Sequence, residues 1–315
     1  MTLLARQLAS ALACLVLMAI GIPAALAGGD QPAAVGKRWG ANYFPNSVVY
    51  DQDGKPLHFY DDVIKGKIVV VSFIFTSCKD LCPLTIARLA EVRNRLGDAV
   101  GRDVFFVTVS IEPEKDTPAA LKAYAETFQT GQGWQFLTGN PDEIKEIRSK
   151  FGELSRNKSQ HNAEVVLGND RTGEWARDSA FSDPVLLTMN IRAMDPDWRA
   201  QPTNVSAPSA GSAAPMPSLP GVAMYRRLCM ACHTVGKGDR VGPDLNGVSK
   251  RRTHDWLTEF ISNPEQMRQQ NDATTLALSA KFKGAIMPSL GLSKADAAEL
   301  IAYIDEQSKV LSAKQ

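Results

Sequence analysis

Residues 67–83, KIVVVSFIFTSCKDLCP, constrain the fold more than any other part of this sequence. The unbroken run of Val, Ile and Phe over residues 68–75 is typical of a strand buried on both faces. Residues 84–96 follow with apolar side chains at helical spacing. Cys78 and Cys82 therefore lie where a buried strand gives way to a helix, whose N-terminus favours the thiolate form of a cysteine. We expect redox or metal chemistry there.

The sequence after this junction alternates strand and helix signals. Apolar runs at 104–111 and 134–137 predict two more buried strands. Thr117-Pro118 and Asn140-Pro141 each place a capping residue before a proline, which predicts two helix starts. The segment 185–191 fits either a strand or a helix.

Turn residues predict a hairpin on each side of this region. Asp53-Gly54 lies within residues 46–60, and a turn at 169–173 separates two short apolar stretches. Strands that alternate with helices form a βαβ core, and a dithiol at its first strand–helix junction indicates an α/β thioredoxin-like fold.

The length of the chain indicates two domains, and its N-terminal segment indicates export. A chain of 315 residues suits two domains, and its net charge of +1 gives no support for a nucleic-acid partner. Residues 201–219 are rich in Pro, Ser and Ala without charge, so we interpret them as a linker between domains at 28–200 and 220–315. Residues 1–27 have the pattern of a signal peptide, or alternatively of a retained membrane anchor. We expect a periplasmic location, or one on the outer face of the cytoplasmic membrane.

The second domain carries Cys229-Met230-Ala231-Cys232-His233, the attachment pattern of a c-type haem. The thiols of Cys229 and Cys232 can bond to the porphyrin vinyl groups, and this spacing then brings His233 under the iron. The alternative is a redox dithiol with an incidental histidine. Methionine is the usual sixth ligand of electron carriers, and Met287 is the best placed. His254, at an expected helix start, is a second candidate.

This domain resembles the class I cytochromes c. The similar segments are CMACH, GPDL at 242–245, IMPSLGLS at 286–293 and AELIAYI at 298–304. The resemblance implies a small all-α domain that encloses a haem c, with the Pro243 carbonyl supporting the His233 ring and the terminal helices crossing.

The first cysteine pair has three intervening residues, where thioredoxin-type enzymes have two. If the segment were helical, the spacing i, i+4 would place both sulfurs on one face and allow a chelate or a disulfide. Two thiolates and an imidazole select copper, especially Cu(I), or zinc. His161, just before an expected strand, is the best third ligand; His58 lies in a hairpin and suits a structural or surface role.

FTSCKDLCP at 75–83, VTVSIEPEKDTPAALKAYA at 107–125 and His161 resemble the Sco/SenC family. The resemblance implies a thioredoxin-like fold that binds copper through Cys78, Cys82 and His161 and helps to assemble the CuA centre of cytochrome oxidase. Two departures stand out: Lys79 replaces the usual proline, and Gln160-His161-Asn162 replaces the usual Asp-His-Ser.

Two functions follow from these patterns. The first is a copper chaperone for an oxidase subunit that carries the CuA site, or for another periplasmic thiol or copper protein, with the haem as redox partner. The second is a thiol–disulfide reductase in which Cys78 and Cys82 are the catalytic dithiol and exchange electrons with the haem.

Overall fold

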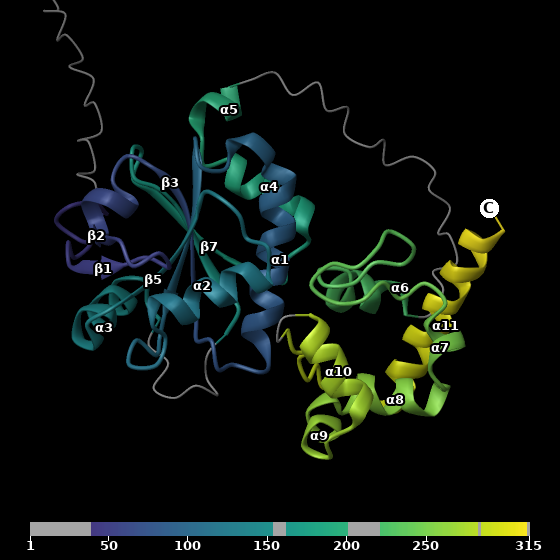
Figure 1. The fold of residues 1–315 in the computed structure, drawn as a ribbon. Helices are drawn as coiled ribbons and strands as arrows, with labels where there is room; N and C mark the ends of the chain where they lie inside the picture. The colour runs from purple at the N-terminus through teal and green to yellow at the C-terminus, as the bar shows by residue number, and fades with distance from the viewer. Residues whose placement is uncertain (1–38, 154–161, 201–220, 283–284, 314–315) are drawn as a thin grey trace, which may run out of the picture. The chain divides into compact units, whose positions relative to one another are not determined.

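The computed structural model describes residues 39–153, 162–200, 221–282 and 285–313 (Figure 1). We call residues 39–200 the sheet domain and residues 221–313 the helical domain, and describe each by itself. The predicted signal segment, the linker at 201–219 and His161 lie outside the described residues. Within the described ranges, no helix combines the length and the hydropathy that a membrane crossing needs.

The sheet domain is built on a mixed sheet whose strand order is β2-β1-β5-β4-β3-β6-β7. The described strands are β1 (Val48–Tyr50), β2 (Pro56–His58), β3 (Ile68–Ile74), β4 (Val104–Ser110), β5 (Trp134–Gly139), β6 (Glu164–Asn169) and β7 (Glu174–Ser179). The pairs β3–β4 and β4–β5 are parallel, and the remaining pairs are antiparallel. Both predicted hairpins, β1–β2 and β6–β7, are confirmed.

The described helices of this domain are η1 (Phe59–Ile64), α1 (Leu81–Leu96), η2 (Gly97–Ala99), α2 (Pro118–Thr127), α3 (Pro141–Lys150), α4 (Pro184–Arg192) and α5 (Pro196–Ala200). Capping signals predicted the starts of α2 and α3. The Thr117 and Asn140 side chains accept backbone N–H groups at the starts of α2 and α3, as predicted. The undecided segment at 185–191 is helix α4, because Asp183 caps it and Pro184 occupies its first position.

Helices cover both faces of the sheet, as the unbroken apolar runs of β3 and β4 require. Every residue of β3 is buried. Helices α1, α2 and α4 contribute to the core on one face, and α1 and α4 run side by side (Figure 1). Helix α3 and the π-helix η1 pack on the other face with Phe44 and Phe151. This layered arrangement is the predicted thioredoxin-like α/β fold.

The helical domain folds around its first and last helices. Its elements are α6 (Val222–Met224), η4 (Tyr225–Cys229), α7 (Val248–Arg251), α8 (His254–Ser262), α9 (Pro264–Gln269), α10 (Ala273–Lys281) and α11 (Lys294–Ser312). Tyr225 packs with Leu300 and Ile304 of α11, and its ring lies 5.1 Å from that of Tyr303. A Cβ at Gly221 would lie 2.5 Å from the Glu299 carbonyl oxygen, so the chain needs glycine there. The predicted contact between the terminal helices is confirmed.

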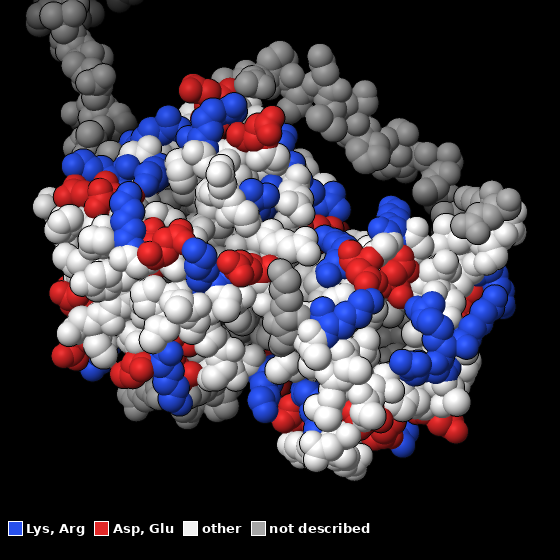
Figure 2. All heavy atoms as spheres, viewed as in Figure 1, with Lys and Arg blue, Asp and Glu red and all other residues white. Residues whose placement is uncertain are grey.

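The face shown in Figure 2 carries both signs of charge, with lysine and arginine side chains scattered among acidic ones. Ion pairs at the surface of the described residues include Lys122 with Asp53 at 2.9 Å and Lys294 with Glu259 at 3.2 Å. Pairs of this kind contribute little to stability.

Candidate functional site

The first cysteine pair lies at the carboxyl end of β3, next to the end of β4. These strands are parallel with Ile74 opposite Ser110, so the loops that follow them meet at one edge of the sheet. The Cys78 N–H donates to the Phe75 carbonyl at 3.1 Å, which places Cys78 in a turn before α1. Cys82 lies in the first turn of α1, which begins at Leu81. The two sulfurs therefore meet across a turn and a helix start, and the conditional i, i+4 helical arrangement does not apply.

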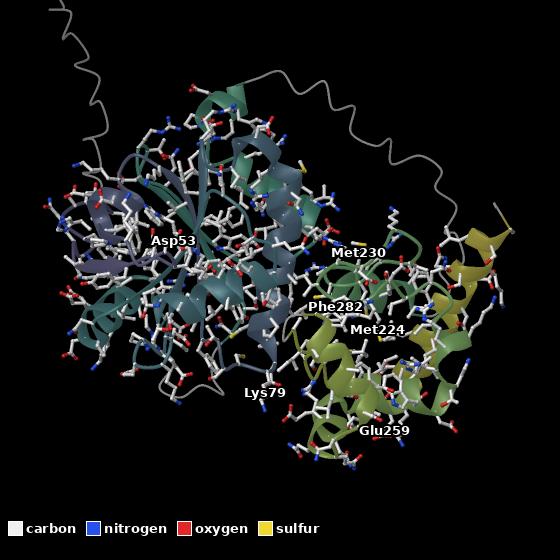
Figure 3. The ribbon with its side chains drawn as sticks, in the orientation of Figure 1. Asp53, Lys79, Met224, Met230, Glu259 and Phe282 are labelled. Atoms are coloured by element: carbon white, nitrogen blue, oxygen red, sulfur yellow. The ribbon has the colours of Figure 1, made fainter. Side chains whose placement is uncertain are left out.

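Two buried carboxylates beyond β4 hold the turn that precedes Cys78. Asp116 is fully buried and accepts hydrogen bonds from the Thr76 N–H, the Thr76 hydroxyl and the Ser110 hydroxyl. Glu112 accepts the Ser77 hydroxyl at 2.7 Å. These bonds fix the direction of the chain immediately before the cysteine. Figure 3 locates this turn by Lys79, the residue after Cys78.

The environment makes the two thiols chemically unequal. A hydrogen bond from the Cys82 thiol, joined by bonds from the backbone N–H groups of Cys82 and Asp80, lowers the pKa of Cys78 to about 6. The Asp80 side chain does not cap α1, so the N-terminal N–H groups of α1 are available to the Cys78 sulfur. The same thiol–thiol hydrogen bond, together with burial, raises the pKa of Cys82. Cys78 is the partly exposed thiolate, and Cys82 is the buried thiol.

We expect the alkylation rate of Cys78 in the reduced protein to rise as the pH increases through about 6. An ordinary cysteine would show this rise near pH 8.5, since only the thiolate reacts. Iodoacetamide labelling, followed by peptide mass spectrometry at a series of pH values, measures the midpoint. Cys82→Ala should raise the midpoint because it removes the thiol donor. A midpoint near 8.5 in the unmodified chain would contradict this assignment.

The structure leaves the third copper ligand untested. His161 lies outside the described residues. Within the part of the chain that is described, no three His, Cys, Asp or Glu side chains gather into a group that could hold a metal ion. The metal donors that the described residues offer here are therefore the sulfurs of Cys78 and Cys82, which suit a soft ion such as Cu(I). His58 is exposed at the end of β2, consistent with a surface role.

The second cysteine motif, CMACH, forms a compact turn, and the Pro243 carbonyl holds the His233 ring at its Nδ1 atom. The His233 N–H donates to the Cys229 carbonyl at 2.9 Å, and the Gly242 N–H donates to the Cys232 carbonyl at 3.0 Å. The His233 Nδ1 atom lies 2.9 Å from the Pro243 carbonyl oxygen, as the resemblance implies. Burial lowers the pKa of His233, which favours the neutral ring. With Nδ1–H donating to Pro243, the Nε2 lone pair is free to bind a metal.

Gly242 is required for this arrangement because the imidazole lies against its backbone. A Cβ at this position would lie 2.5 Å from the His233 Cε1 atom, a distance that real contacts do not reach. The glycine of the GPDL segment thus creates the cradle for the ring. Asp244 of the same segment accepts the N–H groups of Gly236 and Gly238 at 2.8 and 2.6 Å, which closes the loop after the motif.

The predicted haem residues of the helical domain line one apolar cavity. Cys229, Cys232, His233 and Met287 all contribute to its wall. The apolar residues around them include Val241, Leu245, Leu257, Phe260, Ile261, Phe282, Ile286, Leu292, Leu300 and Ile301. Phe282, at the end of α10, is labelled in Figure 3. These residues fit a haem, because the cavity combines an apolar lining with two thiols, a free imidazole nitrogen and a thioether.

The alternative iron ligands, and a redox role for Cys229 and Cys232, fit the structure less well. His254, the first residue of α8, has a largely exposed side chain whose Nε2 lies 3.5 Å from Asp305, so it is directed to the surface. Met224, before the motif, and Met230, within it, pack against the core of the terminal helices (Figure 3). Burial raises the pKa of both Cys229 and Cys232 to about 12. These thiols are therefore unlike Cys78 and do not suit a redox dithiol.

Sequence reasoning assigned no role to Asp116 or to Glu112, although both lie in the segment 107–125 used for the resemblance. The signal that could have found them is the polar stretch SIEPEKDT directly after a buried strand. Carboxylates placed there reach the edge of the sheet where the neighbouring strand also ends. No comparable sequence signal marks Arg268, which lies on α9.

Comparisons with known proteins assign both halves of the chain. Residues 45–171 match the SCO1/SenC family model, and residues 218–308 match the cytochrome c family model. An SCO2-like protein of Rickettsia conorii is 37% identical over 101 residues, which are 32% of this chain and 47% of the relative. The SCO1 protein homolog of Bacillus subtilis is 31% identical over 118 residues, 37% of this chain and 60% of the relative. The chain thus spans about half the length of the curated relatives it matches.

A solved structure covers the same half of the chain. Bradyrhizobium japonicum ScoI, determined with copper bound, is 25% identical, with 47% of this chain and 96% of that chain aligned at a TM-score of 0.40. The matched range 45–171 contains Cys78, Cys82 and His161, and the range 218–308 contains the CMACH motif and Met287. By these family models, the chain is similar to the SCO1/SenC family over residues 45–171 and to the cytochrome c family over residues 218–308.

Proposed function

We propose that this chain is an exported copper-binding protein with a covalently attached haem c, and that it acts in assembly of the CuA site of cytochrome oxidase and in the associated electron transfer. The observation that carries the proposal is the combination, in one chain, of an SCO1/SenC domain with a thiolate-forming pair and a cytochrome c domain with CMACH on an apolar cavity. The first half of the proposal is supported by the similarity of residues 45–171 to the SCO1/SenC family, a resemblance that implies copper binding and a role in oxidase assembly.

The sheet domain would hold copper as cargo through Cys78, Cys82 and His161. Cys78 is the thiolate at neutral pH and needs no deprotonation before it binds the ion. Cys82 supplies the second sulfur from the first turn of α1. The bonds from Asp116 and Glu112 to residues 76–77 restrict where the first sulfur can lie, which favours one binding geometry.

In the helical domain, Cys229 and Cys232 would bond the haem covalently, and His233 and Met287 would bind its iron. Pro243 orients the imidazole so that its Nε2 atom can act as ligand. The walls of the cavity are mostly apolar, which suits the porphyrin ring. A haem held by histidine and methionine supplies a one-electron centre of raised potential.

A thiol–disulfide reductase is the second candidate, and the inequality of the two thiols favours it. A partly exposed thiolate at Cys78 suits attack on a partner disulfide, and the buried thiol of Cys82 suits resolution of the mixed disulfide. Both candidates place the protein in the periplasm or on the outer face of the cytoplasmic membrane, as the signal pattern of residues 1–27 suggests. The partner would be an oxidase subunit carrying the CuA site or another periplasmic thiol or copper protein.

His161→Ala separates the two candidates. If His161 binds copper, its loss should weaken Cu(I) binding by more than about 100-fold, the upper range for loss of a mere outer-shell partner. Competition with a chromophoric Cu(I) chelator measures the affinity, and His58→Ala, at an exposed hairpin position, is the matched control. Reduction of a partner disulfide should survive the substitution if the dithiol acts alone.

Two results would count against copper transfer as the main role. One is an unchanged Cu(I) affinity in His161→Ala, which would remove the histidine from the ligand set. The other is disulfide reduction by a protein that takes up no copper. Titrating the full chain with Cu(I) and Cu(II) while following the haem absorption band also tests whether the two centres exchange electrons.

A further inference from the structure

The segment that carries Met287 has little structure of its own. Residues 285–293 form neither helix nor strand. Pro288 has no N–H to donate and restricts Met287 to extended backbone angles. Among the described residues, the backbone of 286–292 receives one side-chain hydrogen bond, from Arg268, whose Nη1 atom lies 3.0 Å from the Met287 carbonyl oxygen.

Arg268 belongs to a well-anchored element. It lies on α9, next to Met267, which is only 6% exposed. The Asn263 side chain ties the start of α9 to Glu259 of α8 at 3.0 Å. At the other end, the Asp272 N–H donates to the Met267 carbonyl at 3.0 Å, and Asp272 also caps α10. Helix α9 is therefore fixed to the helices on both sides of it.

The Arg268 guanidinium is itself held in one orientation. Its side chain is only 13% exposed. Its Nε and Nη2 atoms donate to the same oxygen of Glu265, one turn earlier on α9, at 3.0 and 2.6 Å. Because that carboxylate fixes one edge of the planar fork, Nη1 is aimed at the Met287 carbonyl. A lysine could not make both contacts with the same geometry.

We propose that Arg268 is a positioning residue that fixes the Met287 backbone, so that the thioether stays in reach of the haem iron. This inference rests on the haem site proposed above. Arg268 does not touch the iron; it acts through the main chain of the ligand. Without it, the Met287 segment would have one anchor fewer, and the sixth ligand would dissociate more readily.

The test uses the full-length haem protein with Arg268→Leu. Ferric haem with a bound methionine sulfur shows a weak charge-transfer band in the red. We expect this band to weaken and exogenous imidazole to bind about tenfold more tightly, which corresponds to losing one charged hydrogen bond. The midpoint potential should fall, because methionine ligation raises it. Met287→Leu sets the limit of full ligand loss, and Gln266→Ala, exposed on the same helix, should leave all three readings unchanged.

Two further variants keep the proposal testable if Arg268→Leu fails to fold. Arg268→Lys and Glu265→Gln should each give intermediate imidazole affinity, since one loses the fork and the other its orienting carboxylate. Covalent haem with the red band in the unmodified chain, but unchanged readings in all Arg268 and Glu265 variants, would overturn the role of Arg268 alone. A chain without covalent haem, or without the red band, would instead overturn the proposed haem site and this inference with it.

Discussion

Serine at both Cys78 and Cys82 is expected to abolish tight Cu(I) binding by the full chain while leaving its haem content unchanged. The hydroxyl group is harder than the thiolate and stays neutral, so it cannot replace a sulfur ligand of Cu(I). The loss should exceed the roughly 10–100-fold that removal of an outer-shell partner causes. Chelator competition measures the copper affinity, and covalent haem is measured in the same samples.

The matched control for this double substitution is serine at Cys229 and Cys232. Those thiols are half-buried, and desolvation raises their pKa to about 12, so we expect them to contribute little to copper binding. Their loss should remove covalent haem and spare the copper site. The reverse pattern, with copper lost on substitution of the CMACH cysteines, would contradict the assignment of the two pairs.

Asp116→Ala is expected to destabilise the sheet domain by about 3 kcal/mol, since it leaves one buried and two half-buried donors unsatisfied. Those donors are the Thr76 N–H, the Thr76 hydroxyl and the Ser110 hydroxyl. Urea unfolding followed by tryptophan fluorescence reports on this domain, because Trp39, Trp134, Trp175 and Trp198 lie in it and only Trp256 lies elsewhere. The turn before Cys78 should loosen as well, which would weaken Cu(I) binding.

The control for Asp116→Ala is Asp103→Ala. Asp103 is an exposed carboxylate that pairs with its neighbour Arg102, and exposed pairs contribute at most about 1 kcal/mol. Similar unfolding midpoints for the two variants would show that the buried network does not support the turn. A destabilised Asp116→Ala protein with unchanged Cu(I) affinity would limit Asp116 to a folding role.

Local signals predicted most of the sheet domain because they act over a few residues. Thr117 and Asn140 cap helices as expected, and the Asp53-Gly54 turn forms the expected hairpin. The segment 185–191 could not be decided, since a short apolar run suits a strand or a helix until its packing partners are known. Its packing against α1 makes it a helix, and Asp183 and Pro184 give a start signal that the apolar run obscured.

Part of the chemistry of the two sites could also be predicted, because the sequence motifs that carry it are short and local. The resemblance to class I cytochromes c, carried by CMACH and GPDL, implies the contact between His233 and Pro243, which the structure shows at 2.9 Å. Asp116 reaches Thr76 across 40 residues, and Arg268 reaches Met287 across 19, so neither contact follows from local pattern. Such bonds depend on which strand ends and helices become neighbours, and only the folded chain supplies that.

The most direct test of the central claim is native mass spectrometry of the full chain, produced in cells that export it and attach haem, and then loaded with Cu(I). We expect a mass equal to the exported chain plus one covalent haem and one copper ion. We also expect the loss of copper alone in Cys78→Ser/Cys82→Ser. A chain that carries haem but takes up no copper, or that keeps its copper after this double substitution, would contradict it.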